Sequence, residues 1–178
     1  MQIELRQLHD RLGTTTVYVT HDQREALTMS DRIAVLDRGR IARIDTPRAI
    51  YDQPGSRFVA EFIGESSFLD VEVVDGICHA AGSDIRAPNV PVARGRCVMM
   101  LRPERLRILD GSESEAMNRF EGKVQNAIYQ GETLLLQLVL ADGSPVSLRM
   151  ATRGDDAPPP AAGSPITVGI AVSDTVLL

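Results

Sequence analysis

Hydrophobic residues in the first part of the chain follow a helical spacing. Residues at intervals of four, three and four lie along one face of a predicted helix: Met1, Leu5, Leu8 and Leu12. Gly13 then provides a helix end. No N-cap residue precedes the pattern, which leaves two alternatives open: the helix originally began further back in a longer chain, or the chain has a natural, frayed terminus.

The next pattern predicts a buried strand followed directly by a helix. Thr14–Thr20 is almost entirely β-branched or aromatic, which is typical of a strand in the interior of a parallel sheet. Asp22 provides an N-cap, and Glu25 occupies the capping-box position. His21 therefore lies where a strand meets a helix, the position at which open α/β sheets bind anionic ligands. Two interpretations of His21 stay open on this evidence: a hydrogen bond to a phosphate oxygen, or a purely structural corner residue.

Three further elements are predicted before residue 64. Asp31–Asp45 contains two short apolar runs around a turn at Gly39, which is typical of a β-hairpin. Thr46 and Pro47 are the N-cap and first residue of a short helix. A second short helix begins after Ser56. Its apolar face is expected to consist of Phe58, Val59, Phe62 and Ile63.

Beyond Gly64 the pattern changes to alternation with frequent turns. Asp75-Gly76 and Asp142-Gly143 have the composition of tight hairpin turns. The predicted strands are 68–74, 77–82, 83–88, 96–101, 120–127, 132–140, 145–150, 166–172 and 175–178, and 154–163 is a proline-rich loop. Many short strands predict a sandwich or barrel, and an OB-like barrel fits this length.

Composition changes at the same point in the chain. The first 63 residues carry equal numbers of basic and acidic residues, so the net charge of −5 arises from the remainder. We therefore expect an α/β domain over residues 1–64 and an all-β domain over residues 65–178. The acidic balance of the second domain, with only Phe68, Phe120 and Tyr129 as aromatic residues, argues against a nucleic-acid partner.

Two strings in the first domain resemble a known family. Residues 16–41 (TVYVTHDQREALTMSDRIAVLDRGRI) and 46–65 (TPRAIYDQPGSRFVAEFIGE) resemble the last third of the nucleotide-binding domain of ABC-transporter ATPases, in the importer group with a C-terminal TOBE extension. Residues 100–104 (MLRPE) and Tyr129–Gly131 resemble TOBE landmarks. Residues 57–73 are most similar to the spermidine/putrescine import group, with ferric-iron and sugar importers as alternatives.

This resemblance implies that His21 is the switch (H-loop) histidine, which contacts the γ-phosphate of ATP in the complete protein. It also implies ATP and Mg²⁺ as cofactors of that protein. The chain contains no G-x-x-x-x-G-K-[S/T] loop, and its single lysine is Lys123. Without that loop we expect no bound cofactor, no metal site and no ATP hydrolysis by this chain alone.

The resemblance further implies the partners. The β domain is expected to form a homodimer, and the complete subunit to associate with transmembrane permease subunits and a solute-binding protein. Its location would be peripheral, at the cytoplasmic face of the bacterial inner membrane. An alternative is that the β domain senses a small molecule, such as an oxyanion, through arginine side chains. The candidate ligands are Arg94, Arg96 and Arg102, although exposed arginines at strand ends usually bind nothing.

Overall fold

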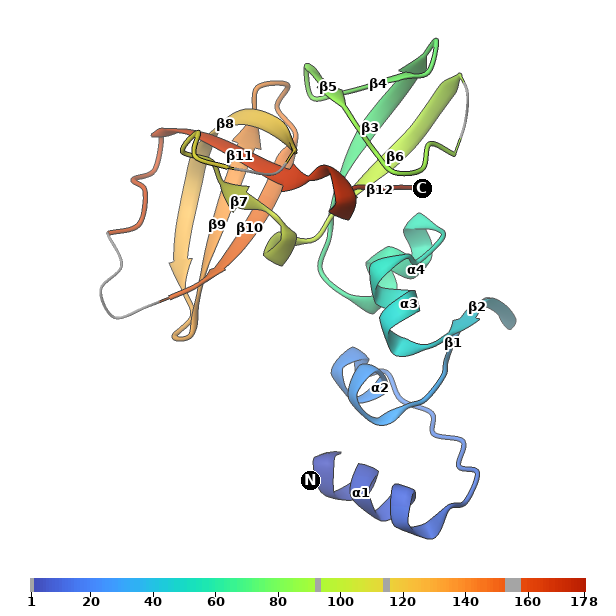
Figure 1. The fold of residues 1–178 in the computed structure, drawn as a ribbon. Coiled ribbons are helices and arrows are strands. Elements are labelled where there is room, and N and C mark those ends of the chain that lie inside the picture. Colours follow the sequence, from blue (N-terminus) through green and yellow to red (C-terminus); the bar gives the residue numbers. More distant parts are fainter. Residues whose placement is uncertain (1, 92–93, 114–115, 153–157) are drawn as a thin grey trace. The chain divides into compact units, whose positions relative to one another are not determined.

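The computed structural model divides into two compact units, Met1–Gly64 and Glu65–Leu178 (Figure 1). It describes all residues except 1, 92–93, 114–115 and 153–157. Part of the predicted loop 154–163, and Met1 and the Leu5 side chain of the predicted helical face, lie outside the described residues. None of the described helices has the length and apolar character that crossing a bilayer requires.

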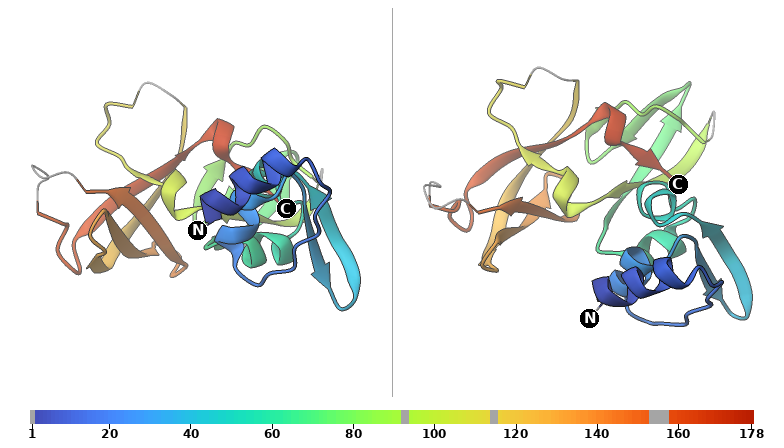
Figure 2. Two further views of the ribbon diagram at one scale, coloured as in Figure 1. Left: turned by 90° about the horizontal axis from the view of Figure 1, so that it is seen from below. Right: turned by 60° about the horizontal axis from the view of Figure 1, so that its bottom comes forward.

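The first unit contains four helices and one two-stranded sheet among its described residues. They are α1 (Gln2–Leu12), α2 (Gln23–Met29), β1 (Ile33–Asp37), β2 (Arg40–Asp45), α3 (Pro47–Asp52) and α4 (Arg57–Ile63). Figure 2 shows the β1–β2 hairpin as a separate ribbon beside the helices of this unit. The predicted hairpin and the short helices that follow it are confirmed.

Local side-chain chemistry explains where these helices begin and end. The Thr46 hydroxyl accepts a hydrogen bond from the backbone N–H of Ala49, and Ser56 caps α4 in the same way. Gly13 ends α1 with a positive φ of 60°, a conformation that costs glycine little. These ends were predictable because each depends on residues close together in the sequence.

The predicted strand Thr14–Thr20 is wrong for this structure. The segment is not paired with any described strand, and its apolar side chains are exposed, with Val17 at 89% and Val19 at 81%. A buried strand needs neighbouring strands to satisfy its backbone N–H and C=O groups. The described part of the first unit provides only the β1–β2 pair, so the expected parallel sheet is not formed.

The buried face of α4 also differs from the prediction. Val59 and Ile63 pack into a small core with Ile33, Val35 and Ile50. Phe58 and Phe62 instead remain exposed and stack on each other, with ring centroids 6.2 Å apart. Of the predicted apolar face, only Val59 and Ile63 are buried in the small core of this unit.

The second unit contains two five-stranded antiparallel sheets. Their orders are β10-β9-β8-β11-β7 and β12-β6-β3-β4-β5. The strands are β3 (Ser67–Val74), β4 (Ile77–Ala80), β5 (Ser83–Ile85), β6 (Gly95–Leu101), β7 (Arg107–Ile108), β8 (Met117–Tyr129), β9 (Thr133–Leu140), β10 (Pro145–Ala151), β11 (Pro165–Ala171) and β12 (Val176–Leu177). Short 3₁₀ helices occur at Pro103–Arg105 and Val172–Asp174. The all-β prediction for this region is confirmed, and β7 is an additional short strand.

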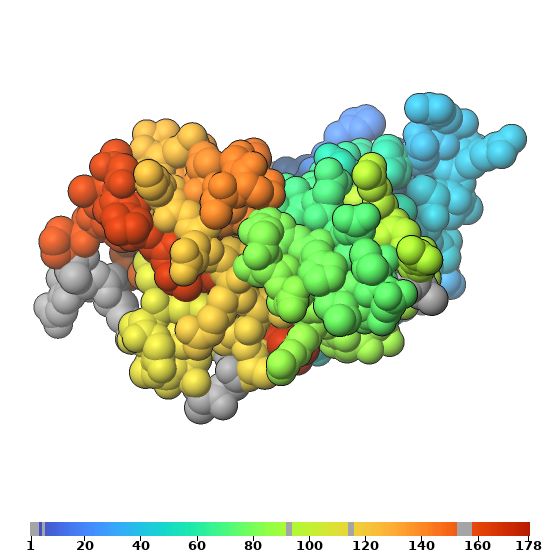
Figure 3. All heavy atoms as spheres, turned by 90° about the horizontal axis from the view of Figure 1, so that it is seen from above, coloured from blue at the N-terminus to red at the C-terminus, as the bar shows by residue number. Residues whose placement is uncertain are grey.

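One hydrophobic core joins the two sheets. Alternate residues of β9 are buried, from Leu134 to Leu140, and alternate residues of β3 are buried, from Leu69 to Val73. Both sets belong to a single cluster. Figure 3 shows the green atoms of the β3–β5 region against the yellow and orange atoms of the other sheet. Cys78 and Cys97 are free and buried in this core.

Candidate functional site

His21 lies between an extended segment and the start of α2. Its side chain is exposed to solvent. The next residue, Asp22, is the N-cap of α2, and its carboxylate accepts hydrogen bonds from the backbone N–H groups of Arg24 (2.8 Å) and Glu25 (3.1 Å). The predicted cap is therefore confirmed, and it fixes the backbone directly after His21.

Glu25 does not complete the predicted capping box. The backbone N–H of Asp22 donates to the hydroxyl of Thr20 (3.0 Å) rather than to Glu25. The Glu25 Oε2 atom instead accepts two hydrogen bonds, from the Thr20 hydroxyl (2.8 Å) and from the Tyr18 hydroxyl (3.0 Å). We call Tyr18, Thr20 and Glu25 the Glu25 latch. The latch residues Tyr18 and Thr20 were missed by the sequence analysis, which treated them only as strand-forming residues.

The latch changes the ionisation of Tyr18. The hydrogen bond to the Glu25 carboxylate, together with its negative charge, raises the pKa of the Tyr18 phenol. The phenol therefore remains a neutral donor to Glu25 over the physiological range of pH. Hydrogen bonds therefore hold the backbone both before and after His21, and the His21 imidazole is exposed to solvent. Such an imidazole can donate a hydrogen bond to an anionic oxygen.

The three predicted arginines do not form one site. Arg94 and Arg96 are exposed at the start of β6, whereas Arg102 directly follows its last residue. Arg96 and Arg102 are thus separated by the length of the strand, roughly 20 Å at about 3.3 Å per residue. Arg102 is only 3% exposed, and its guanidinium donates to the backbone carbonyl of Glu65 at 3.3 Å. A single oxyanion cannot contact both ends of β6.

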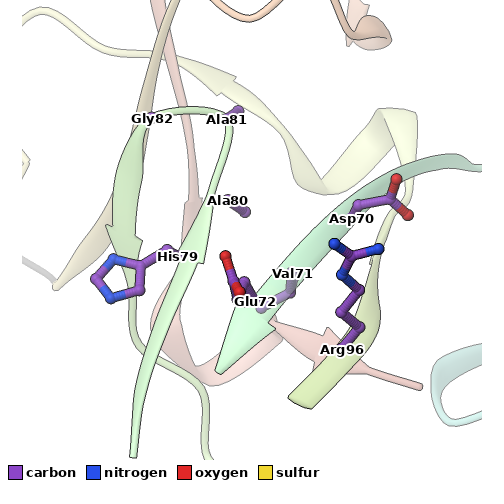
Figure 4. Close-up of a pocket in the computed structure, with 8 residues that line it drawn as sticks. All are labelled: Asp70, Val71, Glu72, His79, Ala80, Ala81, Gly82 and Arg96. Carbon is purple, nitrogen blue, oxygen red and sulfur yellow. The ribbon is translucent and has the colours of Figure 1, made fainter. Parts of the chain in front are cut away.

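Arg96 lies instead beside acidic groups in a hollow of about 470 Å³ on the second unit. Arg96, Glu72 and His79 form a row across β6, β3 and β4, and Asp70 lies on the same face as Glu72 (Figure 4). The Nδ1 atom of His79 lies 2.7 Å from Oδ1 of Asp84. The two carboxylates in the hollow make it unsuitable for binding an oxyanion.

The described residues offer little for a nucleotide besides His21. Across the described ranges, no three His, Cys, Asp or Glu side chains come together as a metal site. Lys123 is exposed on β8 and lies in Gly122-Lys123-Val124, not in a phosphate-binding loop. The exposed His21 imidazole is a group that can donate a hydrogen bond to a phosphate oxygen.

Known proteins that are similar to this chain share its TOBE region and part of its first unit. Residues 99–178 match the family described as "TOBE domain". The chain is 40% identical over 161 residues to the spermidine/putrescine import ATP-binding protein PotA of Ruegeria pomeroyi. The alignment covers 87% of this chain and 43% of that protein. The chain is a TOBE-containing homologue of import ATP-binding proteins. The family resemblance inferred from the sequence is thereby confirmed.

A second relative gives the same result. The protein PotA 1 of Pseudomonas aeruginosa is 38% identical over 157 residues, which is 84% of this chain and 42% of that protein. The chain thus spans about two fifths of the length of these curated relatives. Among solved structures, the cytoplasmic molybdate-binding protein ModG matches 64% of the chain at 14% identity with a TM-score of 0.49. That similarity is too low to assign a ligand.

Proposed function

We propose that residues 1–178 are the C-terminal part of the ATP-binding subunit of an ABC importer, and that the transported solute is a polyamine. The observation that carries this proposal is the 40% identity to a spermidine/putrescine import ATP-binding protein. The alignment of 161 residues is longer than residues 65–178, so it includes part of the first unit as well as the TOBE domain. The relationship therefore does not depend on the β domain alone.

His21 is the residue through which this chain takes part in ATP hydrolysis. ATP, with its Mg²⁺, supplies the phosphoanhydride bond that is broken in the complete subunit. The exposed imidazole of His21 donates a hydrogen bond to the γ-phosphate, where negative charge must be stabilised. The remaining phosphate contacts come from residues outside this sequence, so the chain by itself does not hydrolyse ATP.

The β domain and the partners follow from the same assignment. The second unit serves as a dimerisation domain, which keeps two ATP-binding subunits together. The complete subunit associates with transmembrane permease subunits at the cytoplasmic face of the bacterial inner membrane, and an external solute-binding protein delivers the polyamine. None of the residues described above needs to contact the solute.

A chimeric transporter tests the proposal. The segment of the Ruegeria pomeroyi relative that aligns with this chain is replaced by residues 1–178, and the chimera is combined with the relative's permease in cells that lack polyamine import. We expect uptake of labelled spermidine and ATP hydrolysis by the purified complex. The His21→Ala variant of the chimera should lose most of both activities and keep only a low, measurable rate of hydrolysis.

A matched control makes the result specific to His21. His79→Ala changes an exposed histidine of the second unit and should leave hydrolysis unchanged. A chimera that assembles but hydrolyses no ATP, or one whose hydrolysis does not depend on His21, would contradict the proposal.

A further inference from the structure

The Glu25 latch connects the segment before His21 to the helix after it. A single carboxylate oxygen of Glu25 accepts hydrogen bonds from Thr20, one residue before His21, and from Tyr18, three residues before it. Thr20 also accepts the backbone N–H of Asp22, which closes a turn around His21. Each of these bonds reaches a residue within three positions of the imidazole.

The latch is not needed to start the helix. The Asp22 carboxylate already accepts the free N–H groups of Arg24 and Glu25, which are the groups that an N-cap normally satisfies. The Glu25 side chain therefore adds no further cap to α2. Its two hydrogen bonds act on the extended segment before His21.

We infer that Glu25 is a positioning residue for His21. Through its hydrogen bonds to Thr20 and Tyr18, Glu25 holds the backbone next to His21 in the conformation from which the imidazole reaches the phosphate. This inference rests on the proposed role of His21. Catalytic groups lose efficiency steeply when they are displaced, because the interaction must be made in one geometry. Two hydrogen bonds from hydroxyl groups to one carboxylate hold the backbone conformation next to His21 better than one such bond would.

The test uses ATP hydrolysis by the chimeric transporter. Glu25→Ala should lower kcat on the order of 10- to 100-fold and leave KM for ATP nearly unchanged, because other residues bind the nucleotide. Glu25→Gln keeps a side-chain oxygen in place and should restore most of the activity. Tyr18→Phe and Thr20→Val each remove one donor and should cause smaller losses, which keeps the inference testable if Glu25→Ala does not fold.

A double substitution separates positioning from a general structural role. If Glu25 acts through His21, Glu25→Ala should cause no further loss in a His21→Ala background. If it only stabilises the domain, the two losses should multiply. Multiplied losses, or a Glu25→Ala variant with normal kcat, would overturn the inference.

A measurement without ATP gives an independent readout. In the 178-residue chain, nuclear magnetic relaxation of the His21 amide should show greater motion in Glu25→Ala than in the parent chain. The matched control is Glu61→Ala, which removes an exposed carboxylate that accepts a hydrogen bond from Arg57 at 2.7 Å. This control should leave the His21 amide unchanged, and an equal response would overturn the inference.

The result also separates this inference from the proposed function. If His21→Ala has no effect on hydrolysis, the proposed function fails. If His21→Ala strongly lowers hydrolysis but Glu25→Ala changes neither kcat nor the motion of the His21 amide, only the positioning role fails.

Discussion

The side-chain amide of Asn118 pairs with the backbone of Arg86 in both directions. Its Oδ1 accepts the Arg86 N–H at 2.8 Å, and its Nδ2 donates to the Arg86 carbonyl at 2.7 Å. Asn118 belongs to β8 of one sheet, whereas Arg86 directly follows β5 of the other. The amide thus takes the place of a peptide group in a neighbouring strand and links the two sheets.

We predict that Asn118→Ala lowers the free energy of unfolding by about 2–4 kcal/mol. Asn118 is 2% exposed, and its Nδ2 also donates to the buried hydroxyl of Thr175 at 2.8 Å. The substitution would remove three hydrogen bonds, two to the backbone of Arg86 and one to Thr175, whose hydroxyl would keep its bond to the Ala171 carbonyl at 3.1 Å. Urea unfolding followed by circular dichroism measures the change.

Asn126→Ala is the matched control for this prediction. Asn126 lies on the same strand, is exposed, and donates through its amide to Gln137 at 2.9 Å. We expect it to change stability by no more than about 0.5 kcal/mol. Equal losses for the two variants would show that burial and the link between sheets are unimportant.

A second prediction concerns the close contact of β8 with β9 at Gly122. A Cβ atom at this position would lie 2.6 Å from the backbone carbonyl oxygen of Val139, which cannot move without disturbing the sheet. Gly122→Ala should therefore destabilise the second unit by about 1–3 kcal/mol, the range for overpacked sites. Differential scanning calorimetry of the whole chain measures it as a lower Tm.

Lys123→Ala is the comparison for Gly122→Ala. Lys123 is the next residue of β8, and it is exposed. Its replacement should leave Tm almost unchanged. A Gly122→Ala chain as stable as the Lys123→Ala chain would mean that the two strands separate at Gly122 at little cost.

The third prediction follows from the raised pKa of Tyr18. The hydrogen bond to Glu25 favours the neutral phenol in the folded chain. The stabilisation is therefore complete below the ordinary tyrosine pKa of about 10, and it is lost as the pH rises through the higher folded value. Glu25→Gln removes the negative charge, so Tyr18 should deprotonate at lower pH in that variant.

Alkaline titration of tyrosinate absorbance measures this shift. Subtracting the titration of the Tyr18→Phe chain isolates the signal of Tyr18 from that of the other tyrosines. Glu61→Gln removes a carboxylate that is far from Tyr18 in the sequence, and it should not move the midpoint of the Tyr18 titration. An identical Tyr18 midpoint in the parent chain and in Glu25→Gln would contradict the hydrogen bond.

Features set by neighbouring residues were predictable from the sequence. The Asp75-Gly76 turn is an example, because both residues adopt a positive φ (50° and 80°) that Asp and Gly tolerate better than most residues. The strands of the second unit were likewise predictable, since alternating burial follows from the period of two. Thr14–Thr20 was not, because a strand depends on a partner that local composition does not reveal.

The site was predictable only in part. The sequence located His21 at the start of a helix and identified Asp22 as its cap. The Glu25 latch was missed because it depends on how the extended segment and α2 meet at His21, which the pattern within each segment does not reveal. The arginines were grouped by their closeness in sequence, but a strand separates residues that a turn would bring together. Arg96 and Arg102 consequently lie at opposite ends of β6.

The last prediction concerns the oligomeric state. We expect a homodimer formed mainly through the second unit, where the end of β8 leaves Ile128 41% and Tyr129 72% exposed. Sedimentation equilibrium should give twice the chain mass, and Tyr129→Glu should shift the population towards monomer. Leu36→Glu, at a residue of the first unit that is 59% exposed, should leave the dimer intact. A monomer at every concentration, or a dimer disrupted by Leu36→Glu and not by Tyr129→Glu, would contradict dimerisation through the β domain.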